Sequence, residues 1–261
     1  MLICPVCKKP LVFRQHAAVC ESNHSFDVAR EGYVNLLLGS RSGDLTGDSK
    51  ESARSRRDLL NKGYYSPLKN ALISLLADAQ GSMLDICCGE GYYTSAIAAA
   101  TALDVYGFDI SREMVRLAAK RGAGKYFVAN LAAIPVADES VDVATHLFAP
   151  FQEKEFSRIL KRGGKLYSVV PGKTHLYGLK QAVYDTPYYN DEKLPQTQSL
   201  QLVDVHHVSE QITLSSREDI RAVFQMTPYF YRTSQKDKAK LEAYTSLTTD
   251  VSFLIAEYVK P

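Results

Sequence analysis

From residue 58 onward, the apolar positions of the chain change their period in a regular alternation. Residues 66–79 show Leu and Ile at helical spacing behind a Ser-Pro start, which predicts a helix. Short apolar runs typical of buried strands then alternate with amphipathic helical segments. The expected strands are residues 83–88, 103–110, 125–130, 140–149 and 165–170, and the expected helices are residues 92–100, 111–121 and 153–161. Strands joined through helices predict an α/β fold with a mostly parallel sheet.

The alternation stops in residues 177–208, which are rich in Tyr, Pro and Gln and show no clear period. We interpret this stretch as an insertion and expect its two adjacent histidines, His206 and His207, at the surface. A helix over residues 217–225 and an apolar strand near residues 251–259 follow. The pattern therefore assigns residues 58–261 to one α/β domain.

The N-terminal part has a different pattern. Residues 1–38 are dense in turn-forming and metal-ligating residues, whereas residues 39–57 are polar, rich in Ser and Gly, and nearly free of apolar side chains. The second stretch predicts a linker. A unit of about 38 residues is too small for a core alone to hold its fold, so we expect bound metal to supply much of its folding free energy. Such a module should be removable without disturbing the parallel sheet.

The spacing of two pairs of residues indicates a metal site. Two residues separate Cys4 from Cys7, and three residues separate Cys20 from His24. Three thiolates and one imidazole at this spacing can surround Zn²⁺ tetrahedrally and leave no place for water, which is typical of a structural site. Unpaired cysteines in a small core are the alternative interpretation, and His16 competes with His24 as the fourth ligand.

Composition narrows the class of protein. Of the 261 residues, 46% are apolar and 23% are charged, as in a globular protein with a real core. Five cysteines, an odd number, argue against a disulfide framework, and the N-terminus lacks a secretory signal, so we expect a cytoplasmic protein. The chain shows no apolar run of about 18 residues that would span a membrane.

The net charge of +2 is too small for strong nonspecific attraction to nucleic acid, so any RNA contact must be a local patch. The basic runs that are candidates for phosphate contact contain Arg54, Arg56, Arg57, Lys161 and Arg162. Solvated helix faces are an equally good interpretation of each of them.

The turn after the first expected strand carries the clearest chemistry. In LDICCGEGYYT, residues 84–94, Gly89 and Gly91 allow the tight turn and close backbone approach that a bound nucleoside needs. Asp109 ends the next strand, where a carboxylate can accept both ribose hydroxyls of an adenosine ligand. Such turns also bind dinucleotides or serve packing, but the third Gly of the pyrophosphate fingerprint is missing here.

This turn, together with FDIS, resembles motif I and the second-strand acid of class I S-adenosylmethionine methyltransferases. The resemblance implies a Rossmann-like domain with a mostly parallel seven-stranded sheet. Members of this class usually have Gly where this chain has Cys87. The chain departs from the motif at this turn position, and the departure bears on the backbone conformation of the turn.

A longer ordered series is similar to the RlmA family of 23S rRNA guanine-N1 methyltransferases across nearly the whole chain. It consists of CPVCKKPL, the Cys20 and His24 pair, HSFDVAREGYVNLL, GDS, RRDLLNKGYYSPL, CGEGYYT, FAP, PGKTHL and FQMTPYFYR. The resemblance implies a zinc module that helps to hold RNA, often a homodimer, and a target guanine in one rRNA hairpin near the macrolide-binding exit tunnel.

The resemblance also implies roles for single residues. Zinc would be bound by Cys4, Cys7, Cys20 and His24. The donor, S-adenosylmethionine, would be contacted by Tyr65, Gly89, Glu90, Asp109 and His175. From the residues alone, His175 is equally well interpreted as a loop histidine at the start of a helix.

Three functions stay open at this point. The first is methyl transfer to N1 of a guanine of 23S rRNA. The second is a methyltransferase for a small molecule or a protein, with the zinc module as an accessory. The third is an RNA-binding protein without catalysis, in which Cys87 has abolished donor binding.

Overall fold

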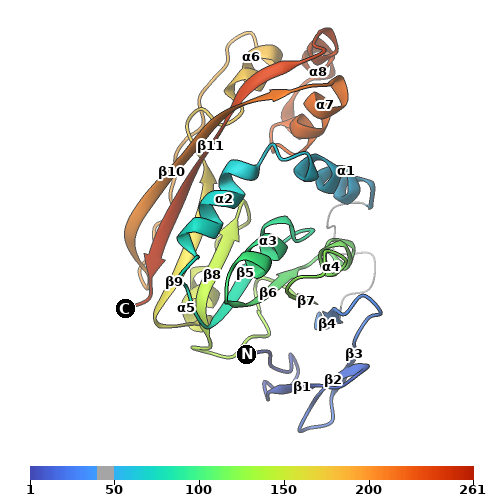
Figure 1. Cartoon of the computed structure of the whole chain (residues 1–261), viewed down its shortest axis with the longest axis vertical. Helices are drawn as coiled ribbons and strands as arrows, with labels where there is room; N and C mark the ends of the chain where they lie inside the picture. The colour runs from blue at the N-terminus through green and yellow to red at the C-terminus, as the bar shows by residue number, and fades with distance from the viewer. Residues whose placement is uncertain (40–49) are drawn as a thin grey trace.

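The computed structural model describes residues 1–39 and 50–261. Its centre is a large sheet whose strands are β4 (Val34–Asn35), β5 (Ser82–Ile86), β6 (Asp104–Asp109), β7 (Lys125–Val128), β8 (Val141–Leu147), β9 (Leu160–Pro171), β10 (Gln201–Leu214) and β11 (Leu247–Val259). They lie in the order β10-β11-β9-β8-β5-β6-β7-β4 (Figure 1). Pairing is parallel from β4 to β9 and antiparallel at β11 and β10. This mostly parallel sheet is the class I arrangement, and the chain reverses direction across the sheet between β5 and β8.

The helices of the large domain cover both faces of this sheet. They are α1 (Lys50–Asn61), α2 (Ser66–Leu75), α3 (Tyr92–Ala100), α4 (Arg112–Ala119), α5 (Glu153–Ile159), α6 (Tyr177–Val183), α7 (Arg217–Gln225) and α8 (Gln235–Ala239), with short 3-10 helices η1 (Phe230–Arg232) and η2 (Lys240–Ala243). Successive residues of a strand point to opposite faces. Met83 of β5 therefore belongs to the apolar cluster that includes α2 and α3, and Leu84 to the cluster that includes α5.

The predicted linker is wrong over its second half. Helix α1 begins at Lys50, so residues 50–57 are helical, and residues 40–49 of the linker lie outside the described part of the chain. Ala53 is fully buried against Met114 and Leu117 of α4. The sequence pattern did not predict this helix, because its first turns contain few apolar residues.

The predicted insertion contains regular structure. Residues 177–208 include α6 and the first half of β10, a strand at the edge of the sheet. His206 and His207 pair with Ile255 and Leu254 of β11 instead of lying in an irregular segment. The strand showed no period because most of its side chains are exposed on both faces.

The N-terminal module is a small antiparallel sheet of β1 (Leu11–Phe13), β2 (Ala17–Cys20) and β3 (Ser25–Asp27), shown in blue in Figure 1. The prediction that it folds apart from the parallel sheet is wrong. Strand β4, near the C-terminal end of the module, pairs with β7 and adds the eighth strand of the large sheet. Leu2, Val34 and Leu36 are buried in the same apolar cluster as the central strands.

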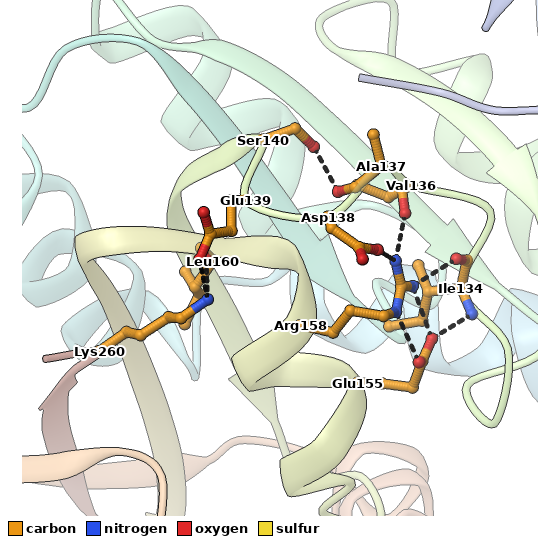
Figure 2. A network of polar contacts seen from close by, with 10 residues as sticks. All are labelled: Ile134, Val136, Ala137, Asp138, Glu139, Ser140, Glu155, Arg158, Leu160 and Lys260. Atoms are coloured by element: carbon orange, nitrogen blue, oxygen red, sulfur yellow. Dashed lines mark hydrogen bonds and ion pairs between the residues drawn. The ribbon is translucent and has the colours of Figure 1, made fainter. Parts of the chain in front are cut away.

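A segment of the loop between β7 and β8, residues 134–138, forms the seat of the module. The Ile3 amide donates to Pro135 O at 3.0 Å, and Leu2 forms an antiparallel bridge with Val136. Figure 2 shows how Arg158 of α5 braces this seat from below. Its guanidinium donates to the backbone carbonyls of Val136 at 2.6 Å and Ile134 at 2.8 Å. The module is therefore attached to the methyltransferase domain through hydrogen bonds as well as a shared core.

Candidate active site and zinc centre

The four predicted metal ligands come together in the N-terminal module. Their ligand atoms all lie within 4.8 Å of one another, and His16 is not among them. His24 Nδ1 lies 3.5 Å from Cys4 Sγ and 3.4 Å from Cys20 Sγ, and Cys7 Sγ lies 3.5 Å from Cys20 Sγ. Zinc bonds of about 2.1–2.3 Å place tetrahedral ligand atoms roughly this far apart. The donor set and its spacing suit a structural zinc ion.

Two backbone turns hold these ligands in positions that suit a bound cation. In the first turn the Lys8 amide donates to Cys4 O, and Lys8 takes a positive φ of 63°. The Lys9 backbone N–H lowers the pKa of the Cys7 thiol to about 6, so this thiol is readily ionised. In the second turn Asn23, with a φ of 60°, closes the loop between Cys20 and His24.

The predicted donor turn lies at the carboxyl end of β5, beside the end of β6. Asp109 accepts hydrogen bonds from the Gly89 amide at 3.0 Å and from the Ser111 amide at 2.9 Å. These two bonds fix the carboxylate at the edge of the sheet. A carboxylate has about four acceptor positions, so a group held in this way can also accept from the hydroxyls of a ribose.

The two glycines of the turn serve different purposes. A Cβ on Gly89 would meet nothing within 4 Å, so open space lies above this residue. A Cβ on Gly91 would lie 2.8 Å from Ala118 Cβ of α4, which makes Gly91 a packing position. Gly89 therefore leaves room for a ligand, and the open space beside the Asp109 carboxylate suits the adenosine part of S-adenosylmethionine.

Cys87, the departure from the usual motif, has a φ of 58°. This left-handed conformation explains why glycine is common at the position. Burial, followed by the charges of Asp109 and Asp85, raises the pKa of the Cys87 thiol to about 12, so the thiol stays protonated. The turn accommodates the cysteine with a strained backbone.

Tyr65 and His175 form a second pair, remote in sequence from the donor turn. Their rings meet edge to face with centroids 5.8 Å apart, and Tyr65 Oη lies 3.4 Å from His175 Nε2. The Ser252 amide donates to His175 Nδ1 at 3.2 Å, which places the proton of the neutral ring on Nε2. Burial lowers the pKa of His175 to about 3, so it stays neutral and donates toward Tyr65.

Glu90 forms a buried ion pair. Its side chain is 2% exposed and forms an ion pair with Arg121, with Arg121 Nη2 and Glu90 Oε2 2.6 Å apart. Arg121 also donates to Asn61 Oδ1 at the end of α1. Glu90 thus ties the donor turn to α1 and to the residues after α4, while its Oε1 atom is buried without a hydrogen-bond partner among the described residues.

Further residues of this region were missed by the sequence analysis. The hydroxyls of Tyr93 and Tyr229 are buried and have no hydrogen-bond partner in the described part of the chain. Burial is the main cause that raises the pKa of both tyrosines. The electrostatic interaction with Tyr65 is the second cause and raises the pKa further. Phe148 directly follows β8 and is half exposed. Nothing in the local pattern distinguishes these aromatic residues from core residues.

The basic candidates lie in two places. Lys161, the second residue of β9, forms an ion pair with Asp142 at 2.7 Å. It lies at the amino end of the parallel strands, far from the donor turn, as does its neighbour Arg162. Burial has the largest effect on the pKa of Glu90 and raises it. Arg56 and Arg57 lie on α1, close enough to Glu90 for their charges to lower this pKa. Exposed Arg54 precedes them on the same helix.

None of the helices in the described residues has both the length and the apolar character that a membrane crossing requires. Residues 83–164 match the family described as a methyltransferase domain. The folded chain is also similar to phosphoethanolamine N-methyltransferase 2 of Haemonchus contortus, solved with S-adenosyl-L-methionine. The TM-score is 0.50 at 20% sequence identity, covering 84% of this chain and 59% of the other. The fold and the domain match define a class I, S-adenosylmethionine-dependent methyltransferase.

The N-terminal residues 2–38 match the zinc ribbon family described as RlmA, N-terminal. A relative in Streptomyces fradiae, 23S rRNA (guanine(748)-N(1))-methyltransferase, is 35% identical over 70% of this chain and 67% of its own length. A Micromonospora griseorubida relative, described as a putative 23S rRNA (guanine-N(1)-)-methyltransferase, is 34% identical over 68% of each chain. YxjB of Bacillus subtilis, with the same description, is 28% identical over 98% of this chain and 96% of its own. The chain belongs to the RlmA family of methyltransferases, and zinc and S-adenosylmethionine are its cofactors.

Proposed function

We propose that this protein methylates N1 of a guanine in a hairpin of bacterial 23S rRNA. The observation that carries the proposal is the presence, in one chain, of a zinc ribbon of the RlmA family and a methyltransferase domain, together with its similarity to relatives named for this reaction. A methyltransferase for a small molecule or a protein would not need the ribbon. The cytoplasm, where ribosomes assemble, is the compartment that this reaction implies.

The donor site is proposed from contacts at two strand ends. Asp109 accepts the ribose hydroxyls, held in place by the amides of Gly89 and Ser111. Gly89 leaves space for the nucleoside. Tyr65, which is buried and is backed by His175, covers the reactive end of the donor and excludes water from it. Glu90 contributes by holding the turn through Arg121.

S-adenosylmethionine supplies the methyl group from its sulfonium centre. The protein then has to hold an unstacked guanine so that N1 lies in line with this group at near-attack distance, and such alignment is worth several kcal/mol. Because His175 donates through Nε2 and stays neutral, it is not the group that takes the N1 proton in this arrangement.

Zinc bound by Cys4, Cys7, Cys20 and His24 has a structural role in this proposal. The four ligands leave no position for water or substrate. The ribbon contacts the start of α4, where Arg112 Nε donates to Tyr33 Oη at 3.1 Å, three residues beyond Asp109. RNA held by the ribbon would therefore lie near the donor edge. The family relation also supports a homodimer.

Methylation of deproteinised 23S rRNA, with the modified base located by mass mapping, tests the reaction. Asp109→Asn removes a charged acceptor at the donor site, and we expect it to weaken donor binding by about 1–3 kcal/mol. Asp104→Asn is the matched control, because Asp104 begins the same strand and pairs with Lys125 at the surface. Calorimetry with S-adenosylmethionine measures both variants. Donor binding without methyl transfer to 23S rRNA by the unmodified protein would rule the substrate out, and equal donor affinity of both variants would rule out the role of Asp109.

A further inference from the structure

Strained backbone gathers at the carboxyl ends of three neighbouring strands. Cys87 follows β5 with a φ of 58°, Phe148 follows β8 with a φ of 55°, and Leu176 lies shortly after β9 with a φ of 55°. These strands lie side by side in the order β9-β8-β5. Non-glycine residues in this conformation persist only where the surrounding structure imposes it, and they concentrate at functional sites. Ligands of open α/β sheets bind at this same edge, where the strand order reverses.

Phe148 is the most exposed of the three residues: it is 50% exposed, whereas Leu176 is 1% exposed and Cys87 is partly buried. Among the described residues, it alone combines a positive φ with a large exposed apolar side chain. Burial of the side chain can offset a strained backbone at Leu176. At Phe148 half of the ring remains in water, so burial offsets less of the strain and another function of the ring has to account for it.

The ring of Phe148 is the outer end of a chain of aromatic contacts that leads to the donor site. Its centroid lies 5.8 Å from that of Phe253. Phe253 in turn lies 5.5 Å from Tyr65 and 4.7 Å from His175. The Phe148 ring is thus supported by Phe253, which itself packs on Tyr65 and His175, and the rest of the Phe148 side chain is exposed.

Groups that can bind the polar edge of a base lie further inside. The hydroxyls of Tyr93 and Tyr229 are buried and lack a hydrogen-bond partner in the described part of the chain. A buried hydroxyl without a partner is unfavourable by about 1–3 kcal/mol, so it indicates a position where a ligand completes the hydrogen bonding. Both hydroxyls are close enough to Tyr65 to interact with it electrostatically.

We propose that Phe148 is the platform on which the acceptor guanine stacks once it has left the RNA stack. The inference rests on the proposed function and adds to it the residue that holds the base. A purine taken out of a hairpin loses its stacking neighbours, and a supported, outward-facing aromatic ring beside the donor turn replaces one of them. The strained φ directs the ring to that position.

Three substitutions separate stacking from other roles of the side chain. Phe148→Leu keeps an apolar side chain without a flat ring, and Phe148→Tyr keeps the ring. Phe148→Gly removes the ring together with the backbone strain, so a loss of function in this variant does not arise from misfolding. Tyr231→Leu is the control for loss of an exposed ring elsewhere, because Tyr231 is 80% exposed.

We expect Phe148→Leu and Phe148→Gly to lower kcat/KM for the RNA by about 5- to 150-fold, the range that base stacking on an aromatic side chain accounts for. Phe148→Tyr and Tyr231→Leu should act like the unmodified protein. Donor affinity should stay the same in all four, and none of them should melt at a lower temperature than the unmodified protein. A hairpin with fluorescent 2-aminopurine at the methylated position should show quenching with the aromatic variants and less quenching with Phe148→Leu.

Several outcomes would overturn the inference while the proposed function stands. These are full activity of Phe148→Leu, equal losses in the Leu and Tyr variants, or equal quenching by all variants. If the unmodified protein binds donor and transfers no methyl group to 23S rRNA, the proposed function fails first and the stacking role fails with it.

Discussion

At the scale of single residues, Cys87 shows what the sequence can say about a departure from a family motif and what only the structure explains. The resemblance identified the position as one where glycine is usual, and the structure gives the reason, a φ of 58°. The donor turn nevertheless closes, with the Cys88 amide donating to Phe108 O at 2.8 Å and the Gly89 amide to Asp109 at 3.0 Å. Cysteine at this position is therefore compatible with donor binding, which argues against the alternative of a protein that has lost it.

Cys87→Gly should stabilise the protein. A non-glycine residue in the left-handed region is strained by about 1–2 kcal/mol. Glycine loses more conformational entropy on folding, about 0.5–1 kcal/mol, so we expect a net gain of about 0.5–1 kcal/mol in the free energy of unfolding. Urea unfolding measures it. Cys87→Ala, which keeps the strained conformation, is the control and should show no gain; a glycine variant less stable than the alanine variant would contradict the prediction.

The state of His175 illustrates what a sequence leaves open at this scale. Its place near the carboxyl edge of the sheet could be predicted from the preceding strand. Its tautomer could not, because the amide that fixes it belongs to Ser252, 77 residues away. The same holds for Tyr93 and Tyr229, since burial of a hydroxyl without a partner depends on every element packed around it.

At the scale of elements, strong periods were predicted correctly and weak ones were not. The central strands and helices α2 to α5 repeat apolar residues with a clear period, because each buries one face against the sheet. Strand β4 has only two residues, so it carries no period of its own. It forms a strand because it can pair with the edge of β7. That edge exists only once the sheet has assembled, so the local sequence does not predict the strand.

The seat of the zinc ribbon gives a prediction at this scale. Arg158 makes hydrogen bonds to Glu155 and Asp138 as well as to two carbonyls of the seat, residues 134–138 (Figure 2). Arg158→Met should lower the free energy of unfolding by about 2–3 kcal/mol, since hydrogen bonds of charged groups are each worth about 1.5–3 kcal/mol. Lys161→Met, which removes one exposed ion pair with Asp142, should lower it by less than about 1 kcal/mol.

Amide hydrogen exchange distinguishes loss of the seat from general destabilisation. The Ile3 amide donates to Pro135 O within the seat, so its exchange should accelerate more in Arg158→Met than the change in global stability accounts for. Exchange of Ile3 that only follows global unfolding would show that Arg158 stabilises α5 and leaves the ribbon unaffected.

At the scale of the whole molecule, the zinc ribbon has two roles that a variant can separate. Its metal-bound turns and outer strands form a surface of their own, whereas Leu2, Val34 and Leu36 complete the core of the large sheet. The paired mutation Cys7→Ser, Cys20→Ser removes ligands and unfolds the turns, but it leaves β4 in the chain. Deletion of residues 1–38 also removes β4 and exposes β7, the neighbour of the strand that ends at Asp109.

We expect both variants to lose methylation of deproteinised 23S rRNA, because a net charge of only +2 leaves the RNA dependent on local patches and the ribbon provides one of them. Donor binding should separate the two. The cysteine variant should bind S-adenosylmethionine nearly as tightly as the unmodified protein, whereas the deletion should melt at a lower temperature and bind donor more weakly. Elemental analysis provides the control, with one zinc per chain in the unmodified protein and none in either variant. Tritium transfer at several salt concentrations, calorimetry and thermal unfolding give the three readouts. Full methylation by the zinc-free cysteine variant would remove the ribbon from RNA recognition, and unchanged donor binding by the deletion would show that β4 does not support the donor edge of the sheet.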